Sequence, residues 1–356
     1  VVIQVSVSLV LLVGAFSFVR SFHGLITMNP GMREQGITVV FLNFSQSHIP
    51  PGHSAEFKGE LLEEVRSVPG ITNAATTTNV PLLGGSWTHA VRVGAVEAAS
   101  KFAWVSPGYF QTMGIPLIRG RNISSQDTES SQRVAVVNQA FVRRFLAGAD
   151  PIGKTLRTGA EPQYPSTVYE IIGVIPDTKY NDLREDTPPM AFAPASQYPA
   201  NGPWTAMMVE SNTSPEIAIK RRIRQTHPEI VLQFSDFRGS IQDGLVRDRV
   251  LATLSGFFGL LAALLVMVGL FGVISYIVPR RSNELGIRIA LGASRSQVVQ
   301  LVMQEAGRLL LIGALAGMAL SLIAGRGASA LLYGVKPYDP LTLAGSLLLL
   351  AVVAAL

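Results

Sequence analysis

Four long apolar runs divide the chain. Val1 to Val19 and Ala252 to Val278 contain no Asp, Glu, Lys or Arg, and Leu309 to Ala324 is a shorter run of the same kind. The fourth run, Leu341 to Leu356, is apolar up to its last residue. A charged side chain at the centre of a bilayer costs roughly 2.5 to 3.5 kcal/mol on insertion scales, so charge-free runs of this length are expected of membrane-spanning helices. The bounds predicted for the four transmembrane α-helices are 1–19, 251–278, 307–325 and 341–356.

Other interpretations of these runs stay open. A buried helix of a soluble protein can be equally apolar, which matters most for the third run because it is short. The first run could be a secretory signal peptide, but it lacks an initiating Met, a basic start and an A-x-A-like cleavage site. We therefore predict a membrane helix there. Both ends of the chain read as cuts in a longer protein, which would leave the fourth helix truncated.

The segment 20–250, between the first two runs, has the pattern of a large α+β domain. Ile37 to Phe44 is strand-like, and His53 to Val68 carries one apolar stripe at helical spacing before Pro69 and Gly70 end it. Further strands are predicted at 133–137, 168–175 and 204–210, and further helices at 138–146 and 215–226. Breaks rich in Pro and Ser near 124–132 and 188–202 suggest two subdomains.

The distribution of charge supports a membrane protein rather than a nucleic-acid-binding one. Only 15% of the residues are charged, where an average soluble domain has roughly 25%. The formal net charge is +5, yet 20–250 holds 22 Lys and Arg against 21 Asp and Glu. The excess therefore lies in short segments around the last three apolar runs. That arrangement is typical of a membrane-topology signal, and we predict no nucleic-acid partner.

The two short connectors differ in charge, and this predicts the orientation of the chain. Pro279 to Arg308 carries five Arg against two Glu, whereas the connector between the third and fourth runs carries only Arg326 and Lys336 against Asp339. Loops rich in Lys and Arg stay in the cytoplasm. The predicted layout is a cytoplasmic elbow at 279–306, a short external loop at 326–340 and an extracytoplasmic domain at 20–250.

The elbow itself has the pattern of two helices joined by a sharp turn. Glu284 and Arg288 stand at i and i+4 with the acid first, which supports a helix. Gly292 is suited to a left-handed stop, and Ser294 with Gln297 forms a capping box that begins a second helix. Such an elbow could act as a lever on the membrane helices. An ordinary amphipathic helix at the membrane surface fits the same periodicity.

The amino-acid sequence of the elbow resembles that of a known family. Residues 281–294 read R-S-N-E-L-G-I-R-I-A-L-G-A-S, which is similar to the cytoplasmic loop of MacB/FtsX-type ABC transporter permeases. In that family the loop is a coupling helix that docks on the ATPase subunit. Further stretches, such as VSPGYFQTMGIPLIRGR and LLYGVKPYDPLTLAG, resemble the same permeases, most of all the duplicated ones of acidobacteria and related soil bacteria. The resemblance implies an ATPase-coupling role for Glu284, Leu285, Gly286, Arg288, Ala290, Leu291, Gly292 and Ala293.

The resemblance implies a function and a set of partners. The chain would be the non-catalytic permease subunit of an ABC transporter, coupling ATP hydrolysis by a separate cytoplasmic ATPase to motion of a MacB-like periplasmic core domain, for efflux or extraction of a substrate. Its implied location is the bacterial inner membrane, with several membrane passes. Further expected partners are a second permease half or copy, the lipid bilayer and a periplasmic adaptor. A membrane-anchored sensor or scaffold that regulates a periplasmic partner, such as a cell-wall hydrolase, is the alternative.

An ATP-binding motif appears in the predicted outer domain. GADPIGKT, residues 148–155, matches the P-loop pattern G-x-x-x-x-G-K-T. A P-loop follows a buried strand and opens a helix, whereas this stretch follows a helical pattern and contains Pro151, which has no N–H to offer a phosphate. We interpret it as a helix-to-strand turn. An enzyme that uses it is the least favoured hypothesis.

The remaining signals indicate no cofactor. The chain has no Cys, and its five His show no metal-ligand spacing, so we predict neither a metal site nor a catalytic residue. Lys220, Arg221, Arg222 and Arg224 make a basic helix, which reads as a solvated face. Gly313 and Gly317 form G-x-x-x-G in the third membrane helix, a pattern typical of close helix packing.

Overall fold

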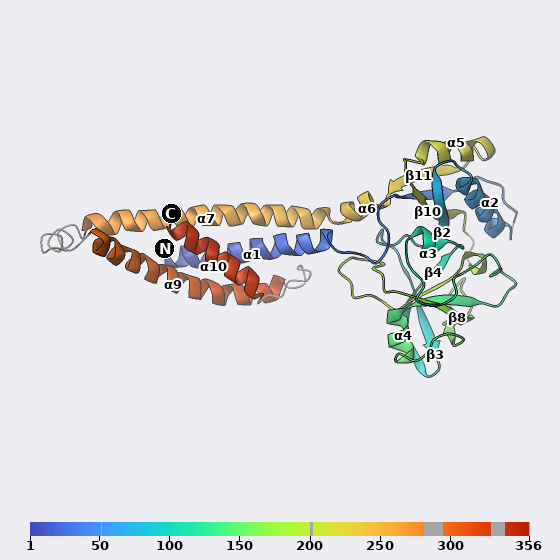
Figure 1. The fold of residues 1–356 in the computed structure, drawn as a ribbon, viewed down its shortest axis with the longest axis horizontal. Coiled ribbons are helices and arrows are strands. Elements are labelled where there is room, and N and C mark those ends of the chain that lie inside the picture. Colours follow the sequence, from blue (N-terminus) through green and yellow to red (C-terminus); the bar gives the residue numbers. More distant parts are fainter. Residues whose placement is uncertain (51, 200–201, 281–294, 329–338, 356) are drawn as a thin grey trace. The chain divides into compact units, whose positions relative to one another are not determined.

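The computed structural model describes residues 1–50, 52–199, 202–280, 295–328 and 339–355 (Figure 1). Two compact units divide the chain. The helical unit comprises Val1–Met28 and Leu245–Leu356, and the inserted domain is Asn29–Gly244, which the sequence places between the first two helices of the helical unit. Each unit has its own hydrophobic core.

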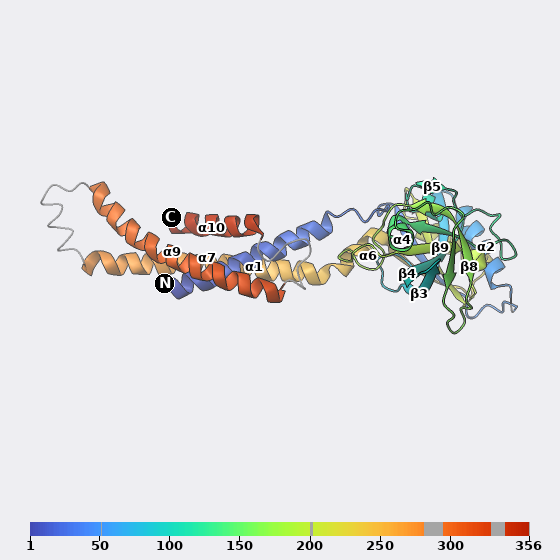
Figure 2. The same cartoon turned by 90° about the horizontal axis from the view of Figure 1, so that it is seen from below.

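The helical unit is built on its first helix. The described helices are α1 (Val2–Ile26), α7 (Val246–Arg280), α9 (Arg295–Ala328) and α10 (Pro340–Ala355). Helix α1 contacts α7, α9 and α10, and both views show the four helices side by side (Figures 1 and 2). Among the described residues three helices are long and apolar enough to cross a membrane, at 2–26, 246–273 and 307–325, and α10 carries a shorter apolar stretch.

Helix α1 runs beyond the predicted end at residue 19. Arg20 lies inside the helix and forms an ion pair with Asp339, the residue just before α10. Asp339 also accepts hydrogen bonds from the backbone N–H and the hydroxyl of Thr342 (3.2 and 2.7 Å), which caps the start of α10. Arg20, which the sequence pattern treats as a boundary, therefore has a partner at the start of another helix.

The first part of the inserted domain is a sheet covered by two helices. Strands β11, β1, β10 and β2 are neighbours in that order, and all their pairings are antiparallel. Helices α2 and α5 contribute Leu61, Val65, Ile219 and Ile223 to its buried core. The bounds are β1 (Ile37–Asn43), β2 (Ile71–Thr77), β10 (Trp204–Ser211), β11 (Val231–Asp236), α2 (Ser54–Arg66) and α5 (Glu216–Thr226).

The second part of the domain is a closed ring of six strands. The order β4-β3-β7-β8-β6-β9 is completed by a parallel pairing of β9 with β4, so each strand of the ring has two neighbours. Its core includes Phe102, Trp104, Phe141 and Tyr169. The bounds are β3 (Trp87–Val93), β4 (Val96–Val105), β6 (Val134–Asn138), β7 (Thr155–Thr158), β8 (Val168–Ile175), β9 (Met190–Pro194) and α4 (Gln139–Leu146). Four shorter elements complete the domain: α3 (Tyr109–Thr112), β5 (Arg119–Gly120), the 3-10 turn η1 (Ala195–Gln197) and α6 (Phe237–Gly244).

A narrow junction joins the two parts of the sheet. Strands β2 and β4 share one register pair, Thr77 with Val105. The hydroxyl of Ser106 accepts a hydrogen bond from the N–H of Thr76 (2.8 Å), and the hydroxyl of Thr78 accepts one from the N–H of Trp104 (3.1 Å). The α+β fold predicted from the sequence is confirmed. The domain has one continuous sheet with two cores, and its division into two subdomains stays a prediction.

Candidate functional site

The central part of the predicted coupling elbow, residues 281–294, lies outside the described residues. Every residue of the predicted ATPase contact falls within 281–294, so the assignment of Glu284, Leu285, Gly286, Arg288, Ala290, Leu291, Gly292 and Ala293 stays a prediction. Helix α9 begins at Arg295 and runs without a break into the predicted third membrane span. The elbow is therefore joined directly, in the chain, to a long helix of the helical unit.

The two glycines of the G-x-x-x-G pattern lie where α9 meets α1. A Cβ added to Gly313 would lie 2.7 Å from the Cβ of Val5, and one added to Gly317 would lie 2.8 Å from the carbonyl oxygen of Ser6. Real Cβ atoms essentially never come closer than 3.0 Å to such atoms. The hydroxyl of Ser6 also donates a hydrogen bond to the carbonyl of Gly313 (2.9 Å). Small residues thus let the two backbones approach closely enough for a polar bond between helices.

Helix α7 packs on α1 in the same way. A Cβ on Gly259 would lie 2.8 Å from the Cβ of Ala15, and Gly269 lies against the amide of Gln4. That amide donates a hydrogen bond to the carbonyl of Leu265 (2.5 Å). Helix α1 is therefore held on two sides by glycine contacts and polar bonds, which is the close packing typical of membrane helices.

GADPIGKT is a turn between a helix and a strand, as the sequence indicated. Helix α4 ends at Leu146, Gly148 and Gly153 adopt positive φ angles of 85° and 77°, and β7 begins at Thr155. The N–H groups that a phosphate would need are already bonded within the protein: Gly153 to the carbonyl of Ile171 (2.9 Å) and Lys154 to that of Pro151 (3.0 Å). The turn lacks the free donors and the following helix of a P-loop.

This geometry gives a first prediction. Lys154 is exposed and sits in the turn, so Lys154→Ala should leave nucleotide binding unchanged and should shift the free energy of unfolding by no more than about 0.5 kcal/mol, as for an ordinary surface substitution. Nucleotide titration of the purified chain and denaturant unfolding measure the two quantities. Saturable ATP binding that Lys154→Ala removes would contradict the turn interpretation.

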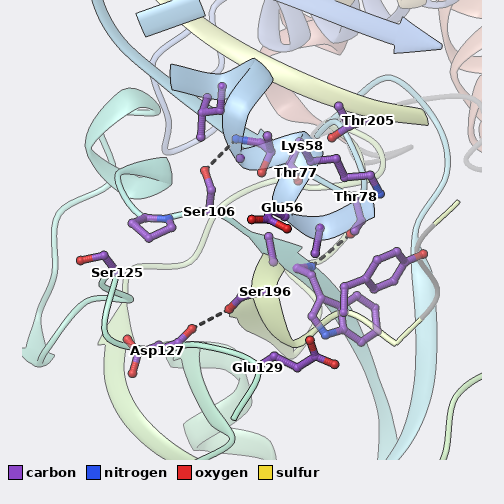
Figure 3. A pocket seen from close by; sticks show the side chains of 18 of the residues that line it. Glu56, Lys58, Thr77, Thr78, Ser106, Ser125, Asp127, Glu129, Ser196 and Thr205 are labelled. Atoms are coloured by element: carbon purple, nitrogen blue, oxygen red, sulfur yellow. Dashed lines mark hydrogen bonds between the residues drawn. The ribbon is translucent and has the colours of Figure 1, made fainter. Parts of the chain in front are cut away.

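The inserted domain contains a cavity that the sequence pattern did not reveal. Its volume is about 570 Å³, within the usual range for small-molecule sites. It lies at the junction of the two cores, between α2, the ends of β2 and β4, the loop 124–129 and the segments 195–198 and 202–205. Figure 3 shows Glu56 and Lys58 of α2 on one side of it and Asp127 and Glu129 of the loop on the other.

Two charged residues at the cavity wall are engaged in hydrogen bonds within the protein. The guanidinium of Arg66 donates to the carbonyls of Ala74 (2.7 and 2.9 Å) and Pro107 (2.8 Å). The buried carboxylate of Asp127 accepts two bonds from the guanidinium of Arg121 (2.8 and 2.9 Å). Burial alone would raise the pKa of Asp127, but the bonds from Arg121 and from the Ser124 backbone outweigh it and lower that pKa. Arg66 and Asp127 therefore fix the shape of the cavity.

One of the five histidines is buried in the ring. His89 is 1% exposed and lies among Trp87, Phe102 and Tyr164, with its Nδ1 3.0 Å from a carboxylate oxygen of Glu161. Burial lowers the pKa of His89, against the opposing effect of Glu161. In the described part of the chain, no three His, Cys, Asp or Glu side chains gather as metal ligands. His89 is therefore best understood as a core residue.

Two family models match the chain. The MacB-like periplasmic core domain matches residues 2–226, and the FtsX-like permease C-terminal matches residues 256–356. The chain belongs to the MacB/FtsX-type ABC transporter permeases. The resemblance seen in the elbow is thus confirmed, and 284–293 falls within the permease match. This permease is embedded in the membrane and carries its periplasmic core domain outside the cytoplasm.

The curated relatives are longer proteins. The permease is 28% identical over 225 residues to the pyoverdine export ATP-binding/permease protein PvdT of Pseudomonas putida, covering 59% of this chain and 33% of that protein. It is 28% identical over 277 residues to the macrolide export ATP-binding/permease protein MacB of Bartonella henselae, covering 72% and 38%. The chain thus spans about a third to two fifths of the relatives it matches. Among solved structures, the periplasmic region of MacB from Actinobacillus actinomycetemcomitans aligns with 62% of this chain and 97% of its own, at 16% identity and a TM-score of 0.42.

Proposed function

We propose that this permease couples ATP hydrolysis by a separate cytoplasmic ATPase to movement of its inserted domain, and so exports or extracts a substrate at the bacterial inner membrane. The observation that carries the proposal is the pair of family matches, which takes in both the periplasmic core domain and the permease region. The proposed role needs no catalytic residue in this chain. It needs a contact with the ATPase and a stiff connection through the membrane.

The packing of the helical unit supports such a connection. The predicted ATPase contact at 284–293 continues in the chain into α9, and α9 is locked to α1 at Gly313 and Gly317. Helix α1 in turn leads along the chain into the inserted domain. A push on the elbow would therefore reach α1 through atoms already in van der Waals contact. Close-packed interfaces transmit such displacements because they resist compression.

The exposed sides of the membrane helices support further partners. Phe257, Leu264, Val268 and Phe271 of α7 are between 46% and 71% exposed. In a membrane these side chains would contact lipid or another permease. The expected partners are therefore the bilayer and a second permease half or copy, with a periplasmic adaptor at the inserted domain.

The decisive experiment tests the elbow. We expect Glu284→Lys combined with Gly292→Pro to weaken co-purification of the cognate ATPase at least tenfold, equivalent to about 1.4 kcal/mol, and to remove stimulation of its ATP hydrolysis. The charge reversal would oppose docking, and proline would distort the turn predicted at Gly292. Quantified pull-down from membranes and ATPase assays in lipid nanodiscs measure both effects.

A charge reversal outside the cytoplasm provides the control. Glu60 is an exposed residue of α2 in the inserted domain, and Glu60→Lys should leave ATPase binding and stimulation at wild-type levels. If the elbow variant bound the ATPase and stimulated its ATP hydrolysis like the wild type, the coupling proposal would be wrong. Loss of both effects in the Glu60 variant as well would show that the assay reports general damage rather than docking.

A further inference from the structure

Among the described residues that line the cavity of the inserted domain, one cation has no ionic partner. Lys58 projects from α2, and its Nζ lies 5.8 Å from the ring centre of Phe44 and 5.8 Å from that of Tyr198. Burial lowers the pKa of Lys58 to about 8, and no carboxylate of the described residues adds a compensating effect. A half-buried ammonium group without a counter-charge is a site that a bound anion would stabilise.

The rest of the cavity favours an apolar ligand body. Trp104, which is 3% exposed, and Tyr198 have ring centres 4.8 Å apart and line the cavity together with the half-exposed Trp204. Aromatic faces of this kind contribute large contact areas to ligand binding. Thr205 and Ser196 add hydroxyl groups to the same wall.

The rim limits how much negative charge a ligand can carry. Glu56 and Glu129 are exposed carboxylates at the cavity wall, and neither has an ion pair within the part of the chain that the structure describes. They would repel a polyanion such as a nucleotide, and a small ligand with one anionic group can pair with Lys58 while keeping away from them. The second cation of the described lining, Arg66, is already paired with Glu63 and bonded to backbone carbonyls, so Lys58 alone is left to bind a ligand, and it selects for a single negative charge.

We propose that this cavity binds a small amphipathic carboxylate, whose anionic group pairs with Lys58 and whose apolar, preferably aromatic, body lies on Trp104, Tyr198 and Trp204. The ammonium group then gains the counter-charge that the protein does not provide. A cavity of about 570 Å³ accommodates a molecule of drug-like size and excludes a folded partner. The proposal adds a ligand class to the outer domain of this permease, and it requires no ATPase.

The natural tryptophans provide the readout. The chain has three, all in the inserted domain, and two of them line the cavity. The full chain in phosphatidylcholine nanodiscs is titrated with phenylbutyrate, with uncharged phenylbutanol and with cationic phenylbutylamine while tryptophan emission is recorded. We expect a saturable change with phenylbutyrate. Its affinity should exceed that of both analogues by about tenfold to a hundredfold, the usual value of a charge-assisted hydrogen bond.

Variants of Lys58 test the anionic contact. Lys58→Met should remove the preference for phenylbutyrate over phenylbutanol, whereas Lys58→Arg should keep most of it. Lys220→Met, which removes an exposed cation of α5, should bind like the wild type. Lys58→Met should not unfold the domain, because the pKa of Lys58 is lower in the folded state than in the unfolded chain. Its positive charge therefore opposes folding below about pH 8.

Several outcomes would overturn the proposal. One is the absence of saturable binding for phenylbutyrate up to its solubility limit in a folded chain, as judged by the melting curve. Equal affinity for phenylbutyrate and phenylbutanol would rule out a contact between the ligand carboxylate and Lys58. An unchanged preference for phenylbutyrate in Lys58→Met would rule it out as well. Tighter binding of phenylbutylamine would assign the cavity to cations held by Glu56 and Glu129. The chain is tested without an ATPase, so none of these results affects the coupling proposal.

Discussion

Gly317→Leu should abolish the stimulation of ATP hydrolysis by this permease while leaving the ATPase itself active. A leucine side chain would occupy the space of the Ser6 carbonyl and the Cβ of Leu9, which lie 2.8 and 3.0 Å from the position of an added Cβ. The nearest atom belongs to backbone and cannot rotate away, so α1 and α9 must separate. Overpacking of this kind costs typically 1–3 kcal/mol, and separation also lengthens the Ser6–Gly313 hydrogen bond. Reconstitution with the ATPase measures the stimulation, and a thermal melt in detergent measures the stability.

A glycine that faces open space supplies the matched control. Gly14 lies in α1, and a Cβ added there meets no atom within 4 Å. Gly14→Leu should therefore retain stimulation and melt close to the wild type. Gly317→Ala should fall between the two, because one methyl group requires a smaller separation of the helices. If Gly317→Leu stimulated the ATPase normally, α1 and α9 would not have to move as one body, and the proposed transmission route would be wrong.

The membrane helices were predictable because the bilayer imposes a simple rule. The scarcity of charge identified the runs at 1–19, 251–278 and 307–325, and the described spans at 2–26, 246–273 and 307–325 overlap all three. The end of α1 was missed because Arg20 reads as a boundary in a one-dimensional pattern. Its ion pair with Asp339 depends on a residue more than 300 positions away. Helix ends that are set by tertiary partners cannot be read from local composition.

The inserted domain shows the same division between local and distant information. Strands with continuous apolar runs, such as β8, and the helices α4 and α5 were predicted to within two residues, because their patterns are local. Strand β2 (ITNAATT) was missed because it is buried through small and polar residues. Closure of the ring was also beyond the sequence. It depends on pairing 101–105 with 190–194, and nothing in either segment specifies the other.

The candidate sites also differ in whether they depend on local sequence patterns or on contacts between residues far apart in the sequence. The coupling role of the elbow, which stays a prediction, could be proposed from the sequence because its motif is contiguous, and the glycine pair 313 and 317 could be singled out for the same reason. The cavity could not, because α2, the loop 124–129 and the segment around Tyr198 meet only after the ring has closed. In the sequence Lys58 is one lysine in a charged helix. Its unusual environment comes from Phe44 and Tyr198, which lie 14 and 140 positions away.

Asn138→Leu should have the largest effect on the stability of the inserted domain. Asn138 is 2% exposed and lies where β6 passes into α4. Its side-chain oxygen accepts hydrogen bonds from the N–H groups of Phe141 and Met190 (both 2.9 Å), and its amide donates to the carbonyl of Pro188 (2.9 Å). One side chain thus caps α4 and ties it to β9 of the closed ring.

Leucine at this position would leave two buried donors and one part-buried acceptor without partners. Each such group costs about 1–3 kcal/mol, so we expect a loss of about 3 kcal/mol or more in the free energy of unfolding, measured by denaturant titration of tryptophan emission. Asn138→Asp keeps the acceptor and should be less damaging, and Asn122→Leu, at an exposed position, should change little. A loss below about 1 kcal/mol for Asn138→Leu would show that the ring closes without this connection.

The cavity should also be affected by Asn138→Leu, because β9 continues into the segment that carries Ser196 and Tyr198. Loss of the hydrogen bond between Asn138 and β9 should therefore weaken the binding of phenylbutyrate even in molecules that remain folded.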